Sequence, residues 1–170
     1  MPPATLHTPR LWLRQLRAGD LGRLAALADT RRVSGELLNV PHPFGPAEAK
    51  ARLAQVTQQW SGPDARTFAV ALLPGGDFIG EVGVHRLPRQ PDVAQLAYWI
   101  GVPYWGHGYG AEAAAAAVAF AREHLRVNAV VAETRVRNLP SRALLERLGF
   151  SCVQETGRLR HYRLTLTTYT

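Results

Sequence analysis

Apolar positions recur along this chain with two different periods, and the changes of period predict the order of its elements. Alternation with many β-branched and aromatic residues predicts strands, whereas a spacing of three or four predicts helices. The expected strands are residues 11–16, 67–73, 78–87, 93–101, 127–136, 150–155 and 161–167. The expected helices are one that follows the N-cap residue Asp20, then 47–60, 111–124 and 141–148. No internal repeat or linker interrupts this pattern, so we expect a single domain over residues 1–170.

The composition supports a folded domain and points to an anionic partner. Of 170 residues, 46% are hydrophobic and 19% are charged, which is far from a disordered composition. Lys and Arg exceed Asp and Glu by 20 to 13, for a formal charge of +7, and the basic residues are scattered rather than clustered. This excess favours phosphates, RNA or an acidic surface as partner. A single cysteine, Cys152, which we interpret as a packing residue, excludes an internal disulfide and a multi-cysteine zinc site.

The start of the chain and its apolar runs bear on the compartment. Residues 1–30 do not show the basic start, apolar core and small-residue cleavage site of a signal peptide. The longest uncharged run, residues 93–111, is broken by polar residues, a proline and four glycines, so we expect no membrane span. A cytoplasmic protein is therefore the expectation.

The segment with the clearest chemistry is a glycine-rich turn between a strand and a helix. Glycines at 106, 108 and 110 allow successive N–H groups to point outward, just where the predicted alanine-rich helix begins. The N-terminus of a helix carries about half a positive charge, so the turn predicts a cradle for an anion such as phosphate. Glu112 in the first turn faces the same dipole favourably and needs no chemical role.

Four interpretations of this turn compete. A nucleoside triphosphate loop is disfavoured because no Lys and Ser/Thr pair follows Gly110. A relaxed dinucleotide fingerprint is matched by Gly106, Gly108 and Ala111, yet only about 60 residues follow it, with one further crossover. A glycine turn without any ligand is the structural alternative.

The other reading rests on a family resemblance that runs from residue 8 to about residue 162. The motifs that carry it are Tyr98-Trp99, then YWGHGYGAEA over residues 104–113, then Asn138-Leu139-Pro140-Ser141 and Leu148-Gly149-Phe150. In this order and spacing the chain resembles the GNAT superfamily of acyl-CoA-dependent N-acetyltransferases, in particular its RimJ/RimL branch. Any one of the motifs alone would be a weak signal.

The resemblance implies a coenzyme A site along this segment. It would place the pyrophosphate on the amides of residues 105–111 and the pantetheine arm beside residues 99–102, with Asn138 bonding the arm and Ser141 near the thioester sulfur. Amides of residues 100–102 would polarise the thioester carbonyl. The implied binding residues are Trp99, Ile100, Gly101, Val102, Trp105, Gly106, His107, Gly108, Tyr109, Gly110, Ala111, Asn138 and Ser141.

The catalytic residues depart from the family pattern. Relatives often have a Tyr acid where this chain has Leu145, and a Glu where it has Gln95. Ser141 is therefore the candidate acid, with a simple N-cap as its alternative role. Glu81 and His85 share one face of a predicted strand, so we expect Glu81 as general base with His85 behind it, against the alternative of two solvated strand residues. We expect no metal site.

Together these features predict an α+β GNAT fold, with a bent, mostly antiparallel sheet of six or seven strands, about four helices, and a fourth and fifth strand that run parallel and splay apart. The implied activity is transfer of an acetyl group from acetyl-CoA to a primary amine, on a protein N-terminus or a small molecule, by direct attack in a ternary complex. A non-catalytic acyl-CoA sensor and a basic RNA- or ribosome-associated protein remain alternatives. We expect no membrane partner, contact with nucleic acid only through a ribosome, and a homodimer as one possible assembly. Acceptor specificity is expected from the early helices and from residues 33–44.

Overall fold

The fold is seen in a computed structural model that describes residues 5–34, 36 and 40–167. Its elements follow the order that the sequence pattern predicts, with two short additions, the strand Leu6–His7 and the helix Arg31–Ser34. The strands are β1 (Leu6–His7), β2 (Leu11–Arg14), β3 (Ala65–Leu72), β4 (Phe78–Leu87), β5 (Gln90–Ile100), β6 (Ala129–Arg135), β7 (Ser151–Thr156) and β8 (Leu159–Thr165). The α-helices are α1 (Leu21–Ala28), α2 (Arg31–Ser34), α3 (Pro46–Ser61), α4 (Tyr109–Phe120) and α5 (Leu139–Arg147).

All eight strands form one sheet, in the order β1-β2-β3-β4-β5-β6-β8-β7. Neighbouring strands are antiparallel except β5 and β6, which run parallel because the chain crosses over between them through α4. The expected fold class and the expected parallel pair are therefore confirmed. The sheet has one or two strands more than expected, because the two-residue strand β1 is too short to leave a periodic signal in the sequence.

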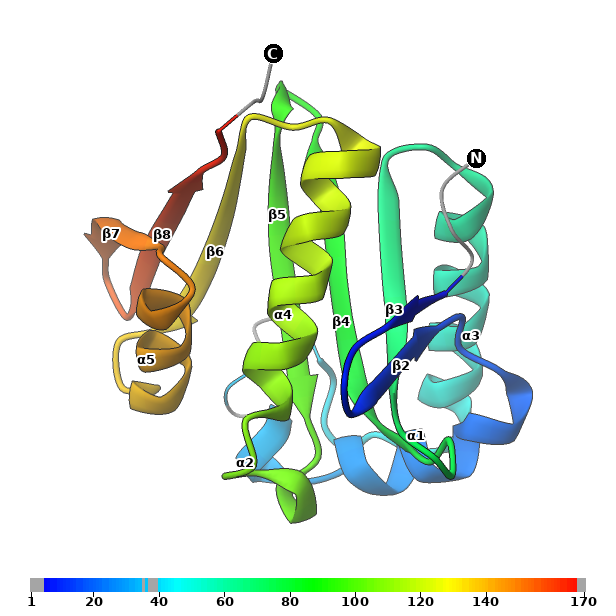
Figure 1. Ribbon diagram of the computed structural model, residues 1–170. Helices are drawn as coiled ribbons and strands as arrows, with labels where there is room; N and C mark the ends of the chain where they lie inside the picture. The colour runs from blue at the N-terminus through cyan, green and yellow to red at the C-terminus, as the bar shows by residue number, and fades with distance from the viewer. Residues whose placement is uncertain (1–4, 35, 37–39, 168–170) are drawn as a thin grey trace.

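Helices cover both faces of the sheet, and each face has its own core (Figure 1). On one face the small residues of α4 let its backbone approach β4 and β5, around a cluster that includes Phe68, Val82, Leu96 and Phe120. On the other face α1 and α3 pack on β3 and β4 around Leu24, Val56 and Phe78. Pro46 in the first turn of α3 starts that helix one residue before the expected position.

The parallel pair β5 and β6 separates soon after it forms. Only residues 93–95 of β5 pair with residues 129–131 of β6, although β5 continues to Ile100 and β6 to Arg135. In Figure 1 the two strands lie together at the top of the view and diverge downward. Because β8 and β7 follow β6 away from β5, the second half of β5 has an open edge. The expected splay is thus present.

The chain segment expected to set specificity, residues 33–44, is only partly described, because residues 35 and 37–39 lie outside the described residues. Within the described part, no helix combines the length and hydropathy that a bilayer crossing requires.

Cys152 differs from the expectation of a packing residue, because it is exposed on β7, an edge strand whose residues are all exposed.

The close approach of β4 and β5 at the open end predicts that Gly80 cannot carry a side chain. A Cβ atom there would overlap the carbonyl oxygen of Trp99 and lie 3.0 Å from the Cα of Ile100, so β5 would have to move. We expect Gly80→Ala to lower the free energy of unfolding by about 1–3 kcal/mol, as overpacking does. Chemical denaturation measures this change.

The matched control is Gly22→Ala, because Gly22 lies in α1 with no atom within 4 Å of its added Cβ. Alanine there should be neutral or stabilise by about 0.5–1 kcal/mol. Equal stability of the Gly80 variant and the original protein would contradict the account of a tight β4–β5 contact.

Candidate active site

The glycine turn predicted to bind an anion adopts a conformation that presents its backbone N–H groups. Gly106 and Gly108 have φ angles of +77° and +80°, in the left-handed region that favours glycine, and Gly108 is the N-cap of α4. Within the described part of the chain, none of the N–H groups of residues 106–111 donates a hydrogen bond. Those of residues 109–111 have no partner within α4 because they open the helix. The turn therefore offers a set of donors at the positive end of a helix.

Glu112 braces this turn against the β1–β2 hairpin, a role that the sequence analysis did not find. Its carboxylate accepts hydrogen bonds from Thr8 Oγ1 at 2.6 Å, from the backbone N–H of Arg10 at 2.9 Å and from Arg10 Nε at 2.7 Å. Arg10 Nη1 also donates to the carbonyl of His107 at 2.8 Å, and its guanidinium lies 4.6 Å from the ring centre of Tyr109. Burial alone would raise the pKa of Glu112, but the hydrogen bonds from Thr8 and Arg10 outweigh it and hold that pKa below its ordinary value.

Aromatic side chains around the turn hold it to the end of β5. Trp105 Nε1 donates to the carbonyl of Ile100 at 2.6 Å, and the guanidinium of Arg32 lies 4.9 Å from the Trp105 ring. The ring of His107 stacks on that of Tyr109 with centroids 5.5 Å apart. The turn is thus fixed from both sides, by α2 and by its own aromatic residues, while its amides stay uncovered.

The open edge of β5 carries backbone groups that point toward the gap. Gly101 donates its N–H to the carbonyl of Ile79 at 2.8 Å, on the β4 side. Because antiparallel strands exchange hydrogen bonds at every second residue, the backbone groups of Ile100 and Tyr98 point the other way, toward β6. The N–H groups of residues 100–102 were expected to polarise the thioester carbonyl. The N–H of Gly101 is not available for this role, because it already donates to Ile79. The Cα of Gly101 packs on Leu27, whose side chain leaves no room for a Cβ.

A hydrogen bond across the gap joins β5 to α5. Tyr98 Oη lies 2.6 Å from Ser141 Oγ, and either atom can be the donor. Burial raises the pKa of Tyr98 to about 12, although the hydrogen bond to Ser141 acts in the opposite direction, so the phenol is protonated at neutral pH. Tyr98 was not expected as a site residue, because an aromatic residue in a β-strand ordinarily belongs to the core. Its partner is 43 residues away in sequence.

Asn138, rather than Ser141, is the N-cap of α5. The Asn138 side-chain oxygen accepts a hydrogen bond from the Ser141 backbone N–H at 3.2 Å, and the helix begins at Leu139. This answers the question left open by the sequence, in which Ser141 had an N-cap role as its alternative. Ser141 instead lies at the third helical position with its hydroxyl on Tyr98. The Asn138 side-chain amide keeps its NH₂ group as a donor.

Glu81 lies on the face of the sheet opposite α4, with both carboxylate oxygens engaged. Arg52 Nε, on α3, lies 3.2 Å from each oxygen, and Trp99 Nε1 donates to Oε2 at 3.0 Å. The residue is buried, at 5% exposure. The Arg52 partner was not expected from the sequence. Glu81 and Trp99 are directly opposite in the β4–β5 ladder, so this ion pair lies at the open end of the gap.

His85 lies on the same face of β4, but at the closed end. It pairs in register with Gln95, the last residue of β5 that pairs with β6. It lies four positions along the strand from Glu81, a distance of about 13 Å. Desolvation lowers the pKa of His85, and a hydrogen bond with Gln95 acts in the opposite direction. The structure therefore places Glu81 beside the open edge and His85 away from it.

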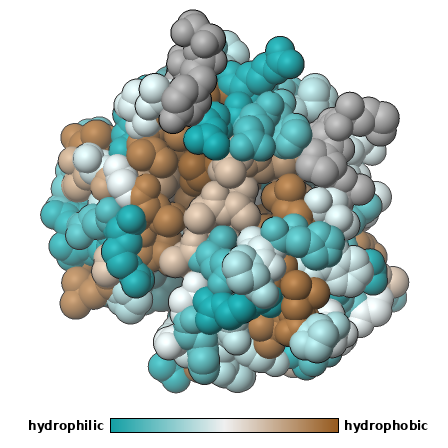
Figure 2. All heavy atoms as spheres, in the orientation of Figure 1, coloured by the Kyte–Doolittle hydropathy of each residue, from teal (hydrophilic) through white to brown (hydrophobic). Residues whose placement is uncertain are grey.

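The described residues contain no group of three or more His, Cys, Asp or Glu side chains arranged to hold a metal ion. The site consists instead of the uncovered amides of the turn, the open β5 edge, the Tyr98–Ser141 pair and the Glu81–Arg52–Trp99 cluster. Figure 2 shows hydrophobic surface along α4 and along the gap toward β6, and a notch in the outline between α5 and the lower end of α4. An extended molecule with an anionic end fits this arrangement, because the donors and the open edge follow one another.

Comparison with known proteins agrees with this arrangement. A family model described as an acetyltransferase (GNAT) domain matches residues 10–151. The uncharacterized N-acetyltransferase p20 of Bacillus licheniformis is 25% identical over 158 residues, which are 93% of this chain and 86% of that protein.

Solved structures share the fold. The ribosomal-protein-S5-alanine acetyltransferase from Vibrio fischeri superposes with a TM-score of 0.81 at 18% identity, over 96% of this chain and 97% of that one. Mycobacterium smegmatis RimJ, in complex with CoA-disulfide, superposes with a TM-score of 0.82 at 16% identity, over 96% of this chain and 88% of that one.

The bracing of the turn by Glu112 predicts an effect on stability that depends on pH. Because its pKa is lowered in the folded protein, its contribution is complete above the ordinary carboxyl range, near pH 4–5, and is lost as the pH falls through the lowered value. We expect Glu112→Gln to lower the free energy of unfolding by about 1–2 kcal/mol at pH 7. The difference from the original protein should shrink on acidification. Denaturant titrations at pH 7 and pH 4 measure both effects.

Glu123→Gln is the matched control. Glu123 pairs with its neighbour Arg122 at 3.2 Å on the surface, with its side chain 57% exposed. Such pairs contribute little, so the change should stay below about 0.5 kcal/mol. Equal losses in the two variants would show that Glu112 does not brace the turn.

Proposed function

We propose, from the premise that this chain belongs to the GNAT family of acetyltransferases, that it transfers the acetyl group of acetyl-CoA directly to a primary amine in a ternary complex. The observation that carries the proposal is the row of uncovered amides at residues 106–111, directly beside the open edge of β5. A diphosphate attached to an extended, amide-bearing arm is the ligand that this combination suits.

In the proposed complex the amides of residues 106–111 bind the pyrophosphate of coenzyme A at the N-terminus of α4. The pantetheine arm adds alongside β5 in place of the missing β6 partner. The backbone groups of Tyr98 and the N–H of Ile100 are available to it, whereas the carbonyl of Ile100 already accepts a hydrogen bond from Trp105 Nε1. The NH₂ group of Asn138 bonds the arm from the other side of the gap. The arm then points its thioester toward the Tyr98–Ser141 pair, which spans this gap.

The leaving thiolate needs a proton, and the Tyr98–Ser141 pair supports a source for it. The amine nitrogen attacks the thioester carbonyl carbon, the carbon–sulfur bond breaks, and the sulfur takes the proton of the Ser141 hydroxyl. Tyr98, which is protonated at neutral pH before the reaction, passes its phenol proton to Ser141 Oγ as that oxygen loses its own, and the tyrosinate that results takes a proton back from water. Two backbone N–H groups, those of Ile100 and Val102, remain to donate hydrogen bonds to the carbonyl oxygen of the thioester. The N–H of Gly101 is not available for this, because it donates to the carbonyl of Ile79.

The amine must lose a proton, and we assign Glu81 as the acceptor of that proton, through water. Glu81 lies at the register of Trp99, beside the open edge, whereas His85 lies about four residues farther along the strand. Oε2 of Glu81 accepts hydrogen bonds from both Arg52 and Trp99, whereas Oε1 accepts only from Arg52 and retains a lone pair for a water molecule. Arg52 and Trp99 hold the carboxylate in one orientation. His85 remains the second candidate.

For the acceptor we propose the N-terminal amine of a protein, with a ribosomal protein as the first one to test. The support is that a solved structure with the same fold is described as a ribosomal-protein-S5-alanine acetyltransferase. We place the approach of this acceptor on the face that holds Glu81, because Glu81 is the residue proposed to take its proton.

A non-catalytic acyl-CoA-binding module is the second candidate. The engagement of both Glu81 oxygens by Arg52 and Trp99 favours it, as does the presence of Leu145 and Gln95 where relatives have ionisable groups. Such a module would bind acetyl-CoA through the same amides without releasing its thiol.

A thiol-release assay separates the two candidates. The protein is incubated with acetyl-CoA and a panel of N-terminal peptides, amino acids and polyamines, and free coenzyme A is measured. The proposal predicts release that depends on an amine, together with a rise in melting temperature on addition of acetyl-CoA alone. A rise in melting temperature without release by any amine would support the binding module, and the absence of both would contradict coenzyme A binding.

The proposed role of Ser141 as general acid, assisted by Tyr98, predicts losses of kcat of different size in two variants. Ser141→Ala should lower kcat by about 10²-fold, in line with the contribution of a general acid. Tyr98→Phe should lower it less, because the serine hydroxyl remains. The KM for acetyl-CoA should stay within about twofold in both, since neither side chain is assigned to the phosphates. A Ser141→Ala enzyme with full kcat would remove the serine from the mechanism.

The base role predicts a change in the pH profile. Glu81→Gln should lower kcat/KM for the amine by about 10²-fold at neutral pH, with activity recovering as higher pH supplies neutral amine directly. Arg52→Gln is the matched variant, because it releases the same carboxylate without removing it. If the two variants lost activity equally and kept the original pH profile, Glu81 would be a positioning residue only.

A further inference from the structure

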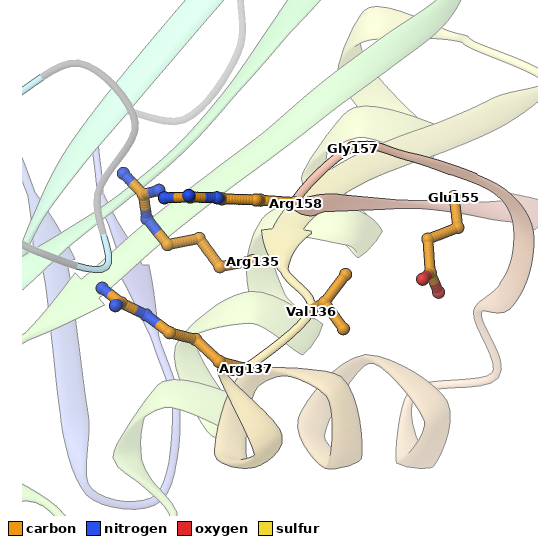
Figure 3. A pocket seen from close by; sticks show the side chains of 6 residues that line it. All are labelled: Arg135, Val136, Arg137, Glu155, Gly157 and Arg158. Atoms are coloured by element: carbon orange, nitrogen blue, oxygen red, sulfur yellow. The ribbon is translucent and has the colours of Figure 1, made fainter.

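A cavity outside the coenzyme A segment is lined by three arginine side chains from two separate parts of the chain. It has a volume of about 430 Å³ and is lined by Arg135, Val136, Arg137, Glu155, Gly157 and Arg158. In Figure 3 the side chains of Arg135, Arg137 and Arg158 extend to the same side of the cavity, whereas Glu155 points away from them. Glu155 has its own partner, Arg160, at 2.9 Å. The carboxylate therefore does not neutralise the three arginines.

The strand register places this arginine cluster, meaning Arg135, Arg137 and Arg158, on the acceptor side of the gap. The last pair between β5 and β6 joins Gln95 and Val131. Four residues farther on, β5 has Trp99 and β6 has Arg135, and residues an even number apart lie on the same face of a strand. Arg135 is thus on the face of Trp99 and Glu81, across the opening from them. On the opposite face of β6, Ala132 is buried in the core beneath α4.

The backbone around the arginine cluster is fixed by hydrogen bonds. The N–H of Val136 donates to the carbonyl of Arg158 at 2.9 Å, which ties the β7–β8 turn to the end of β6. Arg142 Nη1, on α5, donates to the carbonyl of Val136 at 2.8 Å. A site that presents its charges from a fixed backbone loses less freedom when a ligand binds.

The two carboxylates recorded near this cavity have arginine partners of their own, Glu36 with Arg137 and Glu155 with Arg160. Arg137 Nε lies 3.4 Å from Glu36, in the connection between α2 and α3, so one arginine has a carboxylate nearby. Arg135 Nε is buried without a hydrogen-bond partner among the described residues. Like charges that converge on one cavity repel each other, and a planar guanidinium matches a carboxylate with two parallel hydrogen bonds. A carboxylate is therefore the group that would complete this site.

We propose that the arginine cluster binds an acidic side chain of the acceptor, so that the preferred acceptor is a peptide with Asp or Glu close behind its reactive N-terminus. This inference rests on the proposed acetyl transfer, because it assigns the cluster to the acceptor of that reaction. The cavity is on the acceptor face rather than at the N-terminus of α4, which separates this site from the one proposed for the coenzyme A diphosphate.

The test compares three peptides that share the first residue and differ in the next three, which are acidic, neutral amide or basic. Acetyl transfer and, separately, binding of each fluorescent peptide to the protein with coenzyme A are measured for the original protein, Arg158→Glu, Arg135→Gln and Arg89→Glu. Arg89 is exposed in the turn between β4 and β5, at the end of these strands away from the gap. It therefore controls for the change in total charge.

The original protein and the Arg89 variant should prefer the acidic peptide over the neutral one by about tenfold in kcat/KM, which corresponds to one charge-assisted hydrogen bond. Arg135→Gln should lose most of this preference, and Arg158→Glu should shift it toward the basic peptide. The KM for acetyl-CoA should change by less than about twofold. Circular dichroism melting curves establish that each variant is folded.

Four outcomes separate the inference from the proposed function. Transfer without an acidic preference would overturn the inference and leave the transferase proposal intact. Binding of the acidic peptide that depends on Arg135 and Arg158, without transfer, would support the site and contradict the transferase. A tenfold rise in KM for acetyl-CoA with unchanged peptide preference would show that the cluster binds phosphates of coenzyme A, against the inference. Neither transfer nor acidic binding would overturn both.

Discussion

The structure depends on the separation of two parallel strands after only three residue pairs. Beyond Gln95 and Val131, the backbone groups of β5 on that side have no strand partner among the residues that the structure describes. Unpaired strand edges are costly in the interior and attract other chains at the surface. Here the edge ends at a glycine turn with uncovered amides, and the extended ligand with a terminal diphosphate that we propose would satisfy both. The gap, the turn and the proposed ligand are therefore consequences of one constraint.

Contacts between distant segments maintain this gap while leaving the binding groups uncovered. Glu112 and Arg10 hold the start of α4 to the β1–β2 hairpin, so the turn keeps its shape without using its own amides. Tyr98 and Ser141 bridge β5 and α5 through side chains, which leaves the backbone edge open. Glu81, held by Arg52 and Trp99, forms the wall on the other face. Side chains thus carry the structural role and the backbone remains available for a ligand.

The features that the sequence predicted well are local. The glycine turn, α3 with its initial proline and the order of strands all follow from patterns within short windows, and the parallel pair follows from the crossover through a helix. The GNAT fold was identified from motifs at fixed spacing. The helix α5 was expected to begin at residue 141 and begins at Leu139, because Asn138 and Ser141 are both good capping residues and the sequence does not tell which one the helix uses.

The features that the sequence did not reveal are contacts between residues far apart along the chain. The Tyr98–Ser141 bond spans 43 positions and the Arg10–Glu112 pair spans 102. No sequence spacing predicts either contact, because the packing of the whole sheet decides which elements lie next to each other. The same holds for the cluster of Arg135, Arg137 and Arg158, which in the sequence is part of a scattered arginine excess. Only the fold brings these side chains to one cavity.

Binding of a diphosphate by the main-chain amides of residues 106–111 is the claim on which the proposed chemistry depends. An amide-resolved NMR titration with coenzyme A and with pantetheine, which lacks the diphosphate, tests it most directly. Coenzyme A should shift the amide signals of Gly106 to Ala111 strongly, and pantetheine should leave them nearly unchanged. Saturable binding of coenzyme A with no shift in this turn would contradict the claim.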